Sequence, residues 1–241
     1  MKIHVFNSKD LVNQTVSDHI IKFVRENKQG VLGLATGSTP IGVYEALIKD
    51  HKANGTDYSQ IRTVNLDEYV NLDKNHPESY YSFMHRNLFN EINVNKDNIN
   101  LPDGNNKDLI EASKAYDLVL EQNQPDIQIL GIGANGHIGF NEPGTPFDST
   151  THIVYLQEQT RKDNARFFNS IDEVPTQAIT MGIKSIMQAK RIILIAFGEN
   201  KAEAVYQMIK GKVTINLPAS ILQNHPNVEV YLDEAAAKKM M

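Results

Sequence analysis

Short apolar runs alternate with longer amphipathic segments along the chain. The apolar runs predict buried strands, and most are too uniformly apolar for the edge of an antiparallel sheet. They cover residues 3–6, 31–35, 61–66, 127–130, 191–197 and 228–232. The segments between them repeat apolar residues near the 3.6-residue period of a helix, and Pro40 and Pro77 suit a first helical turn. The predicted helices cover residues 10–27, 40–52, 77–90, 107–122, 161–168 and 199–210.

This alternation predicts an α/β fold: a doubly wound, mainly parallel sheet flanked by helices, of the Rossmann-like type. The sequence contains no internal repeat, no low-complexity stretch and no proline- or serine-rich linker. We therefore expect residues 1–241 to form a single domain.

Composition narrows the class of protein. The chain has 241 residues, of which 41% are hydrophobic and 22% charged, so it is long enough to bury a full core. No apolar run approaches the roughly 18 residues of a membrane span, and the first residues lack the layout of a secretory signal, so we expect a cytoplasmic protein that binds no membrane. The lack of cysteine excludes disulfides and thiolate chemistry, and a formal net charge of -5 argues against a nucleic-acid partner.

The segment LGIGANGHIGFNEPG, residues 130–144, places His137 and Glu142 in a glycine-rich turn after an apolar run. Loops that leave the carboxyl ends of parallel strands are where ligands bind in this fold class. Histidine transfers protons near neutral pH, and a nearby carboxylate can hold its tautomer. A structural turn with a solvated histidine is the alternative interpretation.

The segment GLATGSTP, residues 33–40, predicts an anion cradle where a strand turns into a helix. The backbone N–H groups of Gly37, Ser38 and Thr39, the hydroxyls of Thr36, Ser38 and Thr39, and the helix dipole would all favour a phosphate. The segment is neither a Walker motif nor GxGxxG, so it does not indicate a nucleotide. Alternatively, Ser38 or Thr39 simply caps the helix.

Two adjacent acids, Asp67 and Glu68, follow the apolar run at residues 61–66. They point to opposite sides of an extended chain, so at most one faces a cleft. A buried carboxylate there would have a raised pKa and suit a general base, while a solvated strand end is the alternative. We interpret residues 76–84 as a helix start with a core face rather than as part of a site.

Cations and metal ligands are less clearly marked. Lys201 falls in a first helical turn, against the preference of the helix dipole, which suits an anion bound there. Together with Arg166 it would supply positive charge for a phosphate, although surface cations are usually solvated. The histidines lack the spacing of metal ligands, and GxSxG is absent, so we expect no metal and no serine-hydrolase site.

Taken in order, TGSTP, NLDEYV, HPESYYSFM, GIGANGHIGFNEPG, Arg166 and Lys201 make the whole chain resemble the glucosamine-6-phosphate deaminase (isomerase) family. The resemblance implies reversible conversion of glucosamine-6-phosphate and water into fructose-6-phosphate and ammonia, in amino sugar catabolism and without a cofactor. It implies Asp67 as the enolisation base and His137 as the ring-opening group, flanked by Asn135 and Glu142. The phosphate would be bound by Thr36, Gly37, Ser38, Thr39, Arg166 and Lys201.

The chain departs from better-known family members at some positions. Asn135 stands where many members have aspartate, so it can hydrogen-bond His137 but adds no charge. Allosteric hexameric members have arginine and lysine where this chain has His152 and Val154, and they have a longer carboxy-terminal extension. We therefore expect an unregulated enzyme that is a monomer or a small homo-oligomer.

Two alternatives come from other functional classes. A 6-phosphogluconolactonase-like hydrolase shares the fold and a glycine-histidine loop, but its loop continues toward Ser-Leu-Phe-Pro rather than Phe-Asn-Glu-Pro, which makes Glu142 the discriminating residue. A non-catalytic sugar-phosphate sensor would need a DNA-binding module, and none precedes the first predicted strand.

Overall fold

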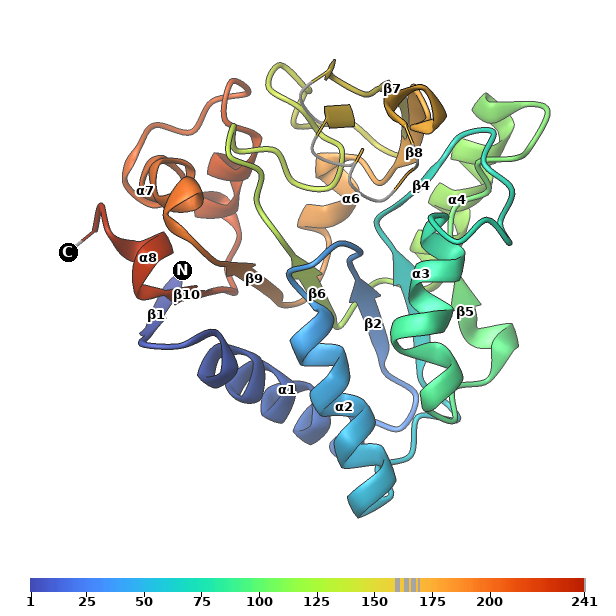
Figure 1. The fold of residues 1–241 in the computed structure, drawn as a ribbon, viewed down its shortest axis with the longest axis horizontal. Coiled ribbons are helices and arrows are strands. Elements are labelled where there is room, and N and C mark those ends of the chain that lie inside the picture. The colour runs from blue at the N-terminus through green and yellow to red at the C-terminus, as the bar shows by residue number, and fades with distance from the viewer. Residues whose placement is uncertain (159–160, 163–164, 166–167, 169, 241) are drawn as a thin grey trace.

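A parallel sheet forms the centre of the computed structural model (Figure 1). The structure describes residues 1–158, 161, 162, 165, 168 and 170–240, and in these residues the sheet has seven strands in the order β1-β10-β9-β6-β2-β3-β5. The strands are β1 (Lys2–Phe6), β10 (Val228–Asp233), β9 (Ile192–Ala196), β6 (Ile127–Leu130), β2 (Val31–Leu34), β3 (Arg62–Asn65) and β5 (Ile99–Asn100). All its pairings are parallel, which confirms the predicted α/β fold.

Helices cover both faces of this sheet. Helices α1 (Lys9–Glu26), α2 (Ile41–Asn54) and α3 (Tyr80–Asn87) lie on the face toward the viewer in Figure 1, and α4 (Leu109–Gln122) and α6 (Ile183–Met187) lie behind it. Helices α7 (Ala202–Lys210) and α8 (Glu234–Ala237) flank the β10 side. This arrangement follows from right-handed crossovers between parallel strands.

The order of the strands reverses between β2 and β6. From β2 the chain continues outward to β3 and β5, whereas from β6 it continues the other way, to β9 and β10. The loops after β2 and β6 therefore diverge and leave a crevice at the carboxyl ends of the strands. Ligands bind at such a switch point in open α/β sheets.

A second, antiparallel sheet, in the order β4-β8-β7, lies beside the carboxyl ends of the main strands. It consists of β4 (Asp67–Tyr69), β8 (Gln177–Thr180) and β7 (His152–Tyr155). The apolar pattern did not predict these strands, because they are short and β7 is partly exposed. The pairing places Asp67 opposite Thr180.

Several predicted boundaries shift in the structure. The helix expected from Pro77 begins at Tyr80 instead, because the side chain of Ser79 accepts a hydrogen bond from the backbone N–H of Ser82 and caps it. The helix expected at 199–210 starts as a 3₁₀ turn, η5 (Glu199–Lys201). Most of the helix expected at 161–168 lies outside the described residues. No described helix combines the length and the apolar character needed to cross a bilayer.

Candidate active site

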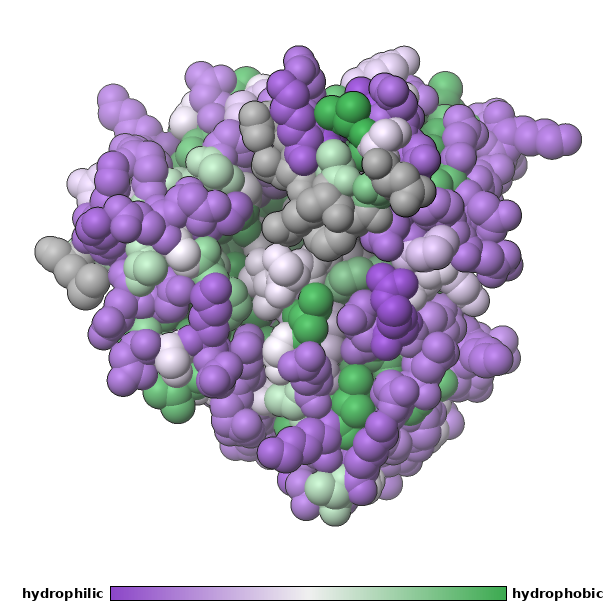
Figure 2. Space-filling view, in the orientation of Figure 1, coloured by the Kyte–Doolittle hydropathy of each residue, from purple (hydrophilic) through white to green (hydrophobic). Residues whose placement is uncertain are grey.

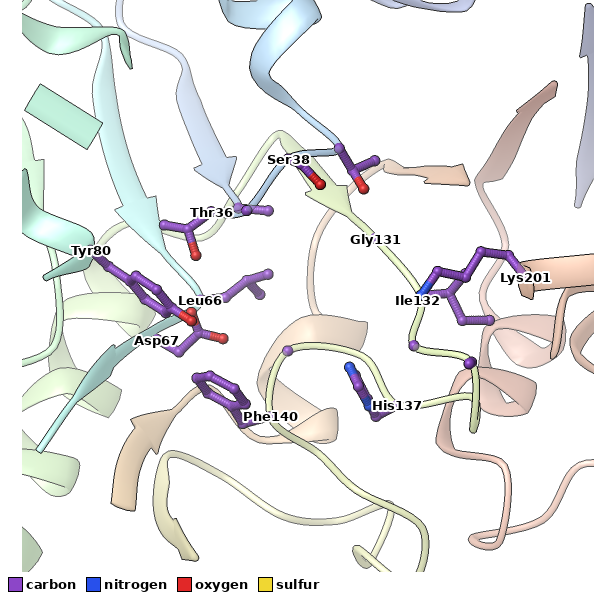
Figure 3. Close-up of a pocket in the computed structure, with 16 residues that line it drawn as sticks. Thr36, Ser38, Leu66, Asp67, Tyr80, Gly131, Ile132, His137, Phe140 and Lys201 are labelled. Atoms are coloured by element: carbon purple, nitrogen blue, oxygen red, sulfur yellow. The ribbon is translucent and has the colours of Figure 1, made fainter. Parts of the chain in front are cut away.

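A pocket of about 250 Å³ opens at the switch point (Figure 3). Most of the residues that the sequence marked as candidates line it, although they come from four separate parts of the chain. These are Thr36, Gly37, Ser38, Thr39, Asp67, His137 and Lys201. Figure 3 shows the Asp67 carboxylate and the His137 ring pointing into the same space from opposite sides. In the space-filling view, residues of intermediate hydropathy gather where α2 begins, in the middle of a largely hydrophilic face (Figure 2).

The loop after β2 supplies small polar groups. Its first residue is anchored by the buried Tyr44 hydroxyl, which donates to the Ala35 carbonyl at 2.6 Å and accepts from the Ala35 N–H at 3.2 Å. Gly37 has a φ of 91°, a left-handed conformation that favours glycine. Helix α2 is capped by Pro40 without a side-chain hydrogen bond, so neither Ser38 nor Thr39 is the N-cap that the alternative interpretation required.

The loop after β6 folds so that the His137 ring lies against the backbone of Gly133. A Cβ atom on Gly133 would lie 2.3 Å from atoms of the imidazole ring, so only glycine leaves room for the ring. The Gly133 N–H donates to the His137 carbonyl at 2.9 Å and closes the turn. The glycines therefore fix the histidine at the pocket wall rather than merely ending a strand.

Glu142 and Asn135 support this histidine from behind. The Glu142 Oε1 atom lies 3.6 Å from His137 Nδ1, and its Oε2 accepts a hydrogen bond from Asn135 Nδ2 at 2.7 Å. The Asn135 side-chain oxygen accepts from the His137 backbone N–H at 3.2 Å. Because the Glu142 side chain is only 12% exposed, its charge acts on the imidazole in a poorly solvated setting.

Asp67 is the buried acid of the pocket. Its residue surface is 6% exposed, and it lies on β4, whose pairing with β8 holds it beside the main sheet. Burial, followed by the charge of Glu68, raises the pKa of Asp67 from 3.8 to about 8. A carboxylate with this pKa accepts a proton from carbon far more readily than a solvated one.

Lys201 lines the opposite side of the pocket from Asp67, on η5 just before α7 (Figure 3). An anion between the β2 loop and this lysine would therefore meet N–H groups, hydroxyls and an ammonium group together. The other predicted cation, Arg166, lies outside the described residues.

Two aromatic residues of the pocket escaped the sequence analysis. Tyr80 and Phe140 line it with nearly parallel rings, 10° apart in plane and 6.1 Å between centroids. The interpretation of residues 76–84 as a helix with only a core face was therefore incomplete. No local signal marks Tyr80, because its position depends on contacts between α3 and β4. Phe140 lies inside the FNEP run, next to residues that were singled out.

Among the residues that the structure describes, no three histidine, aspartate or glutamate side chains come together as a metal-ligand set. The groups that face the pocket are instead suited to proton transfer and to binding an anion.

The sequence of the chain is similar to those of a known enzyme family. Residues 8–231 match the family model described as glucosamine-6-phosphate isomerases/6-phosphogluconolactonase. A glucosamine-6-phosphate deaminase of Halalkalibacterium halodurans is 48% identical over 241 residues, covering 100% of this chain and 98% of that protein. One from Clostridium botulinum strain Alaska E43 is 50% identical, covering 98% of this chain and 96% of that protein.

Solved structures of the same family are also similar to this chain. A monomeric glucosamine-6-phosphate deaminase superposes with a TM-score of 0.97 at 43% identity, covering 99% of both chains. A 6-phosphogluconolactonase from Trypanosoma brucei superposes with a TM-score of 0.79 at 19% identity, covering 100% of this chain and 98% of that one. At that identity the lactonase shares the fold alone.

Proposed function

The chain belongs to the family of glucosamine-6-phosphate isomerases and 6-phosphogluconolactonases, and from this premise we propose that it deaminates and isomerises glucosamine-6-phosphate. Glucosamine-6-phosphate and water become fructose-6-phosphate and ammonia, reversibly. The full-length identity to deaminases confirms the resemblance expected from the motifs. The observation that carries the proposal is a buried carboxylate, Asp67, across a pocket from the supported histidine, His137.

The pocket favours deamination over lactone hydrolysis. Lactone hydrolysis needs a group that activates water, whereas deamination also needs a base that moves a proton between two carbons. Asp67, with its pKa near 8, supplies that second group. The 6-phosphogluconolactonase structures similar to this chain are 17–20% identical and share only the fold, whereas the curated relatives at 46–50% identity are deaminases.

Ring opening is the first step. The sugar enters as a pyranose, and the anomeric hydroxyl must lose a proton while the ring oxygen gains one. His137 carries this proton, because it lies in the pocket and the charge of Glu142 stabilises the imidazolium that forms between the two transfers.

Asp67 then moves a proton from carbon 2 to carbon 1. Removal of the carbon 2 proton gives an enolamine, with a proton taken up on the carbon 1 oxygen. Return of the proton to carbon 1 turns the carbon 2 amine into an iminium group. Water adds to carbon 2, the nitrogen leaves as ammonia, and one proton returns to solvent in place of the one that the carbon 1 oxygen took up, so the proposed steps require no metal and no organic cofactor.

The phosphate group fixes the position of the substrate in the pocket. We assign its binding to the backbone and hydroxyls of residues 36–39, with Lys201 opposite and Arg166 as an additional cation. Binding energy from a group remote from carbons 1 and 2 positions those carbons against Asp67.

The biological setting belongs to the same proposal. Residues 1–241 form one deaminase domain that acts in the cytoplasm, in catabolism of N-acetylglucosamine and related amino sugars. It works without allosteric activation, because His152 and Val154 supply no permanent cation at the expected regulatory positions. We propose a monomer or small homo-oligomer, in line with the monomeric deaminase that this chain resembles.

The test uses purified protein and glucosamine-6-phosphate without added metal or nucleotide, with ammonia and fructose-6-phosphate measured together. Equal release of both, lost in Asp67→Asn, is the expected result. Hydrolysis of 6-phosphogluconolactone with neither product from the amino sugar would overturn the assignment and favour the lactonase. Sigmoidal kinetics that N-acetylglucosamine-6-phosphate abolishes would contradict the unregulated enzyme.

A further inference from the structure

Glu68 is buried directly behind the pocket and accepts three backbone hydrogen bonds. Its Oε1 accepts from the N–H groups of Tyr69 at 2.8 Å and Tyr80 at 2.9 Å, and its Oε2 accepts from Tyr81 at 2.8 Å. The residue is 4% exposed. Burial raises the pKa of Glu68, while the three N–H donors oppose that rise because they favour the carboxylate.

These bonds tie two pocket elements together. Tyr80 and Tyr81 are the first residues of α3, whose N–H groups have no partner within the helix, and Glu68 belongs to β4. Tyr80 lines the pocket that Asp67 faces. The Glu68 carboxylate therefore fixes the distance between the strand that carries the base and the helix that carries an aromatic wall.

Glu68 and Asp67 are neighbours on opposite sides of one strand. Asp67 faces the catalytic pocket, whereas Glu68 lines a separate hollow with Lys74, Tyr81 and Asp103. A negative charge held behind Asp67 opposes ionisation of Asp67. The other titratable groups that face Asp67 from its surroundings are Tyr69, Tyr80, Tyr116, His137 and Lys201.

We propose that Glu68 is a positioning residue for the proton transfer: it locks α3 and Tyr80 against the pocket and holds a fixed negative charge behind Asp67. The proposal rests on the proposed function, because it presumes that Asp67 is the base. It adds a residue that touches no substrate yet sets both the shape of the pocket and the pH range in which the base works.

The experiment compares wild type with Glu68→Gln and with Asp103→Asn. Glutamine is nearly isosteric but carries no charge, and its NH₂ group would face the Tyr81 N–H, a second donor. Asp103→Asn removes a negative charge from an exposed position in the same hollow without touching α3, which makes it the matched control. The readouts are the ¹³C titration of the Asp67 carboxyl in substrate-free protein, assigned with Asp67→Asn, and the pH profile of kcat/KM.

In Glu68→Gln we expect the Asp67 midpoint to fall by about one pH unit, with the rising limb of the profile moving the same way. KM should rise by about fivefold, because the N-terminus of α3 loses an acceptor. Asp103→Asn should leave both close to wild type. An unchanged Asp67 midpoint in folded Glu68→Gln, or an equal shift in Asp103→Asn, would overturn the proposal.

Glu68→Asp covers the case in which the glutamine variant does not fold. It keeps the charge but shortens the reach to α3, so KM should rise while the Asp67 midpoint stays near wild type. An unchanged KM would overturn the positioning role. The titration needs no turnover: wild type that releases no ammonia contradicts the proposed function, whereas active wild type with an unmoved midpoint in Glu68→Gln contradicts the role of Glu68 alone.

Discussion

Two walls of the pocket differ in their chemical groups and in how far those groups are exposed to water. The loop wall, residues 36–39 and 131–142, offers backbone N–H groups, hydroxyls and a histidine whose side chain is 27% exposed, with the buried carboxylate of Glu142 behind that histidine. The strand wall, β4 with the first turn of α3, buries Asp67 and Glu68 to 6% and 4% exposure beside aromatic rings. Groups that keep contact with water cost folding little, whereas buried carboxylates cost stability and gain reactivity. Under the proposed function, the loop wall binds the phosphate and the strand wall supplies the base.

The largest effect should come from removing the base of the strand wall. Asp67→Asn keeps the shape of the side chain but cannot accept the carbon 2 proton, so kcat should fall by about 10³-fold with little change in KM. Ammonia release under saturating substrate measures it, with Asp103→Asn as the surface control. If the variant keeps more than a tenth of the wild-type kcat, Asp67 is not the base, because loss of the group that transfers the proton must lower kcat far more than that.

Glu142→Gln should produce the next largest effect, within the loop wall. The amide cannot stabilise the imidazolium of His137, so kcat/KM should fall by about 10²-fold. An open-chain amino-alditol phosphate, which needs no ring opening, should bind variant and wild type equally as an inhibitor. Weaker binding of that inhibitor by the variant would mean that Glu142 shapes the pocket rather than assisting ring opening.

A smaller effect is expected in the phosphate cradle. Ser38→Ala removes one hydroxyl and leaves the backbone N–H groups, so KM should rise by about tenfold with kcat nearly unchanged. The inhibition constant of inorganic phosphate should rise by the same factor. If KM rises and phosphate inhibition does not, Ser38 contacts another part of the sugar.

The smallest effect concerns the stability of the strand wall and its dependence on pH. The pKa of Asp67 is about 8 when folded and near 3.8 when solvated, so its contribution to stability is present at low pH and lost as pH rises through 8. The free energy of unfolding of Asp67→Asn should therefore exceed that of wild type by about 1–2 kcal/mol at pH 8 and match it at pH 4. Thermal melts at the two pH values test this, and a variant less stable at pH 8 would contradict it.

Six of the seven described strands of the main sheet and the loop wall could be predicted from the sequence, because both depend on local signals, whereas β5, with only two residues, leaves no apolar run. Buried parallel strands read as apolar runs, and the glycines around His137 mark a turn at which the backbone approaches the ring. The opposite directions of Asp67 and Glu68 followed from the alternation of an extended chain.

The strand wall was only partly predictable, for a physical reason. Strand β4 has three residues and is held by pairing with β8, more than a hundred residues later, which no local pattern encodes. Helix α3 starts at Tyr80 rather than near Pro77, and Glu68 binds the N–H groups of that start from 12 and 13 residues away. The involvement of Tyr80 in the pocket depends on those contacts.

The reversal of strand order between β2 and β6 makes the two sides of the pocket separate modules. One half of the main sheet grows outward through β3 and β5, the other through β9, β10 and β1, and only the crevice is common to both. Insertions at the outer edges should therefore leave the crevice unchanged, whereas a change in register between β2 and β6 would displace one half of the site relative to the other. The pairing of β2 with β6 is therefore the part of the fold that has to be preserved when the substrate range is altered.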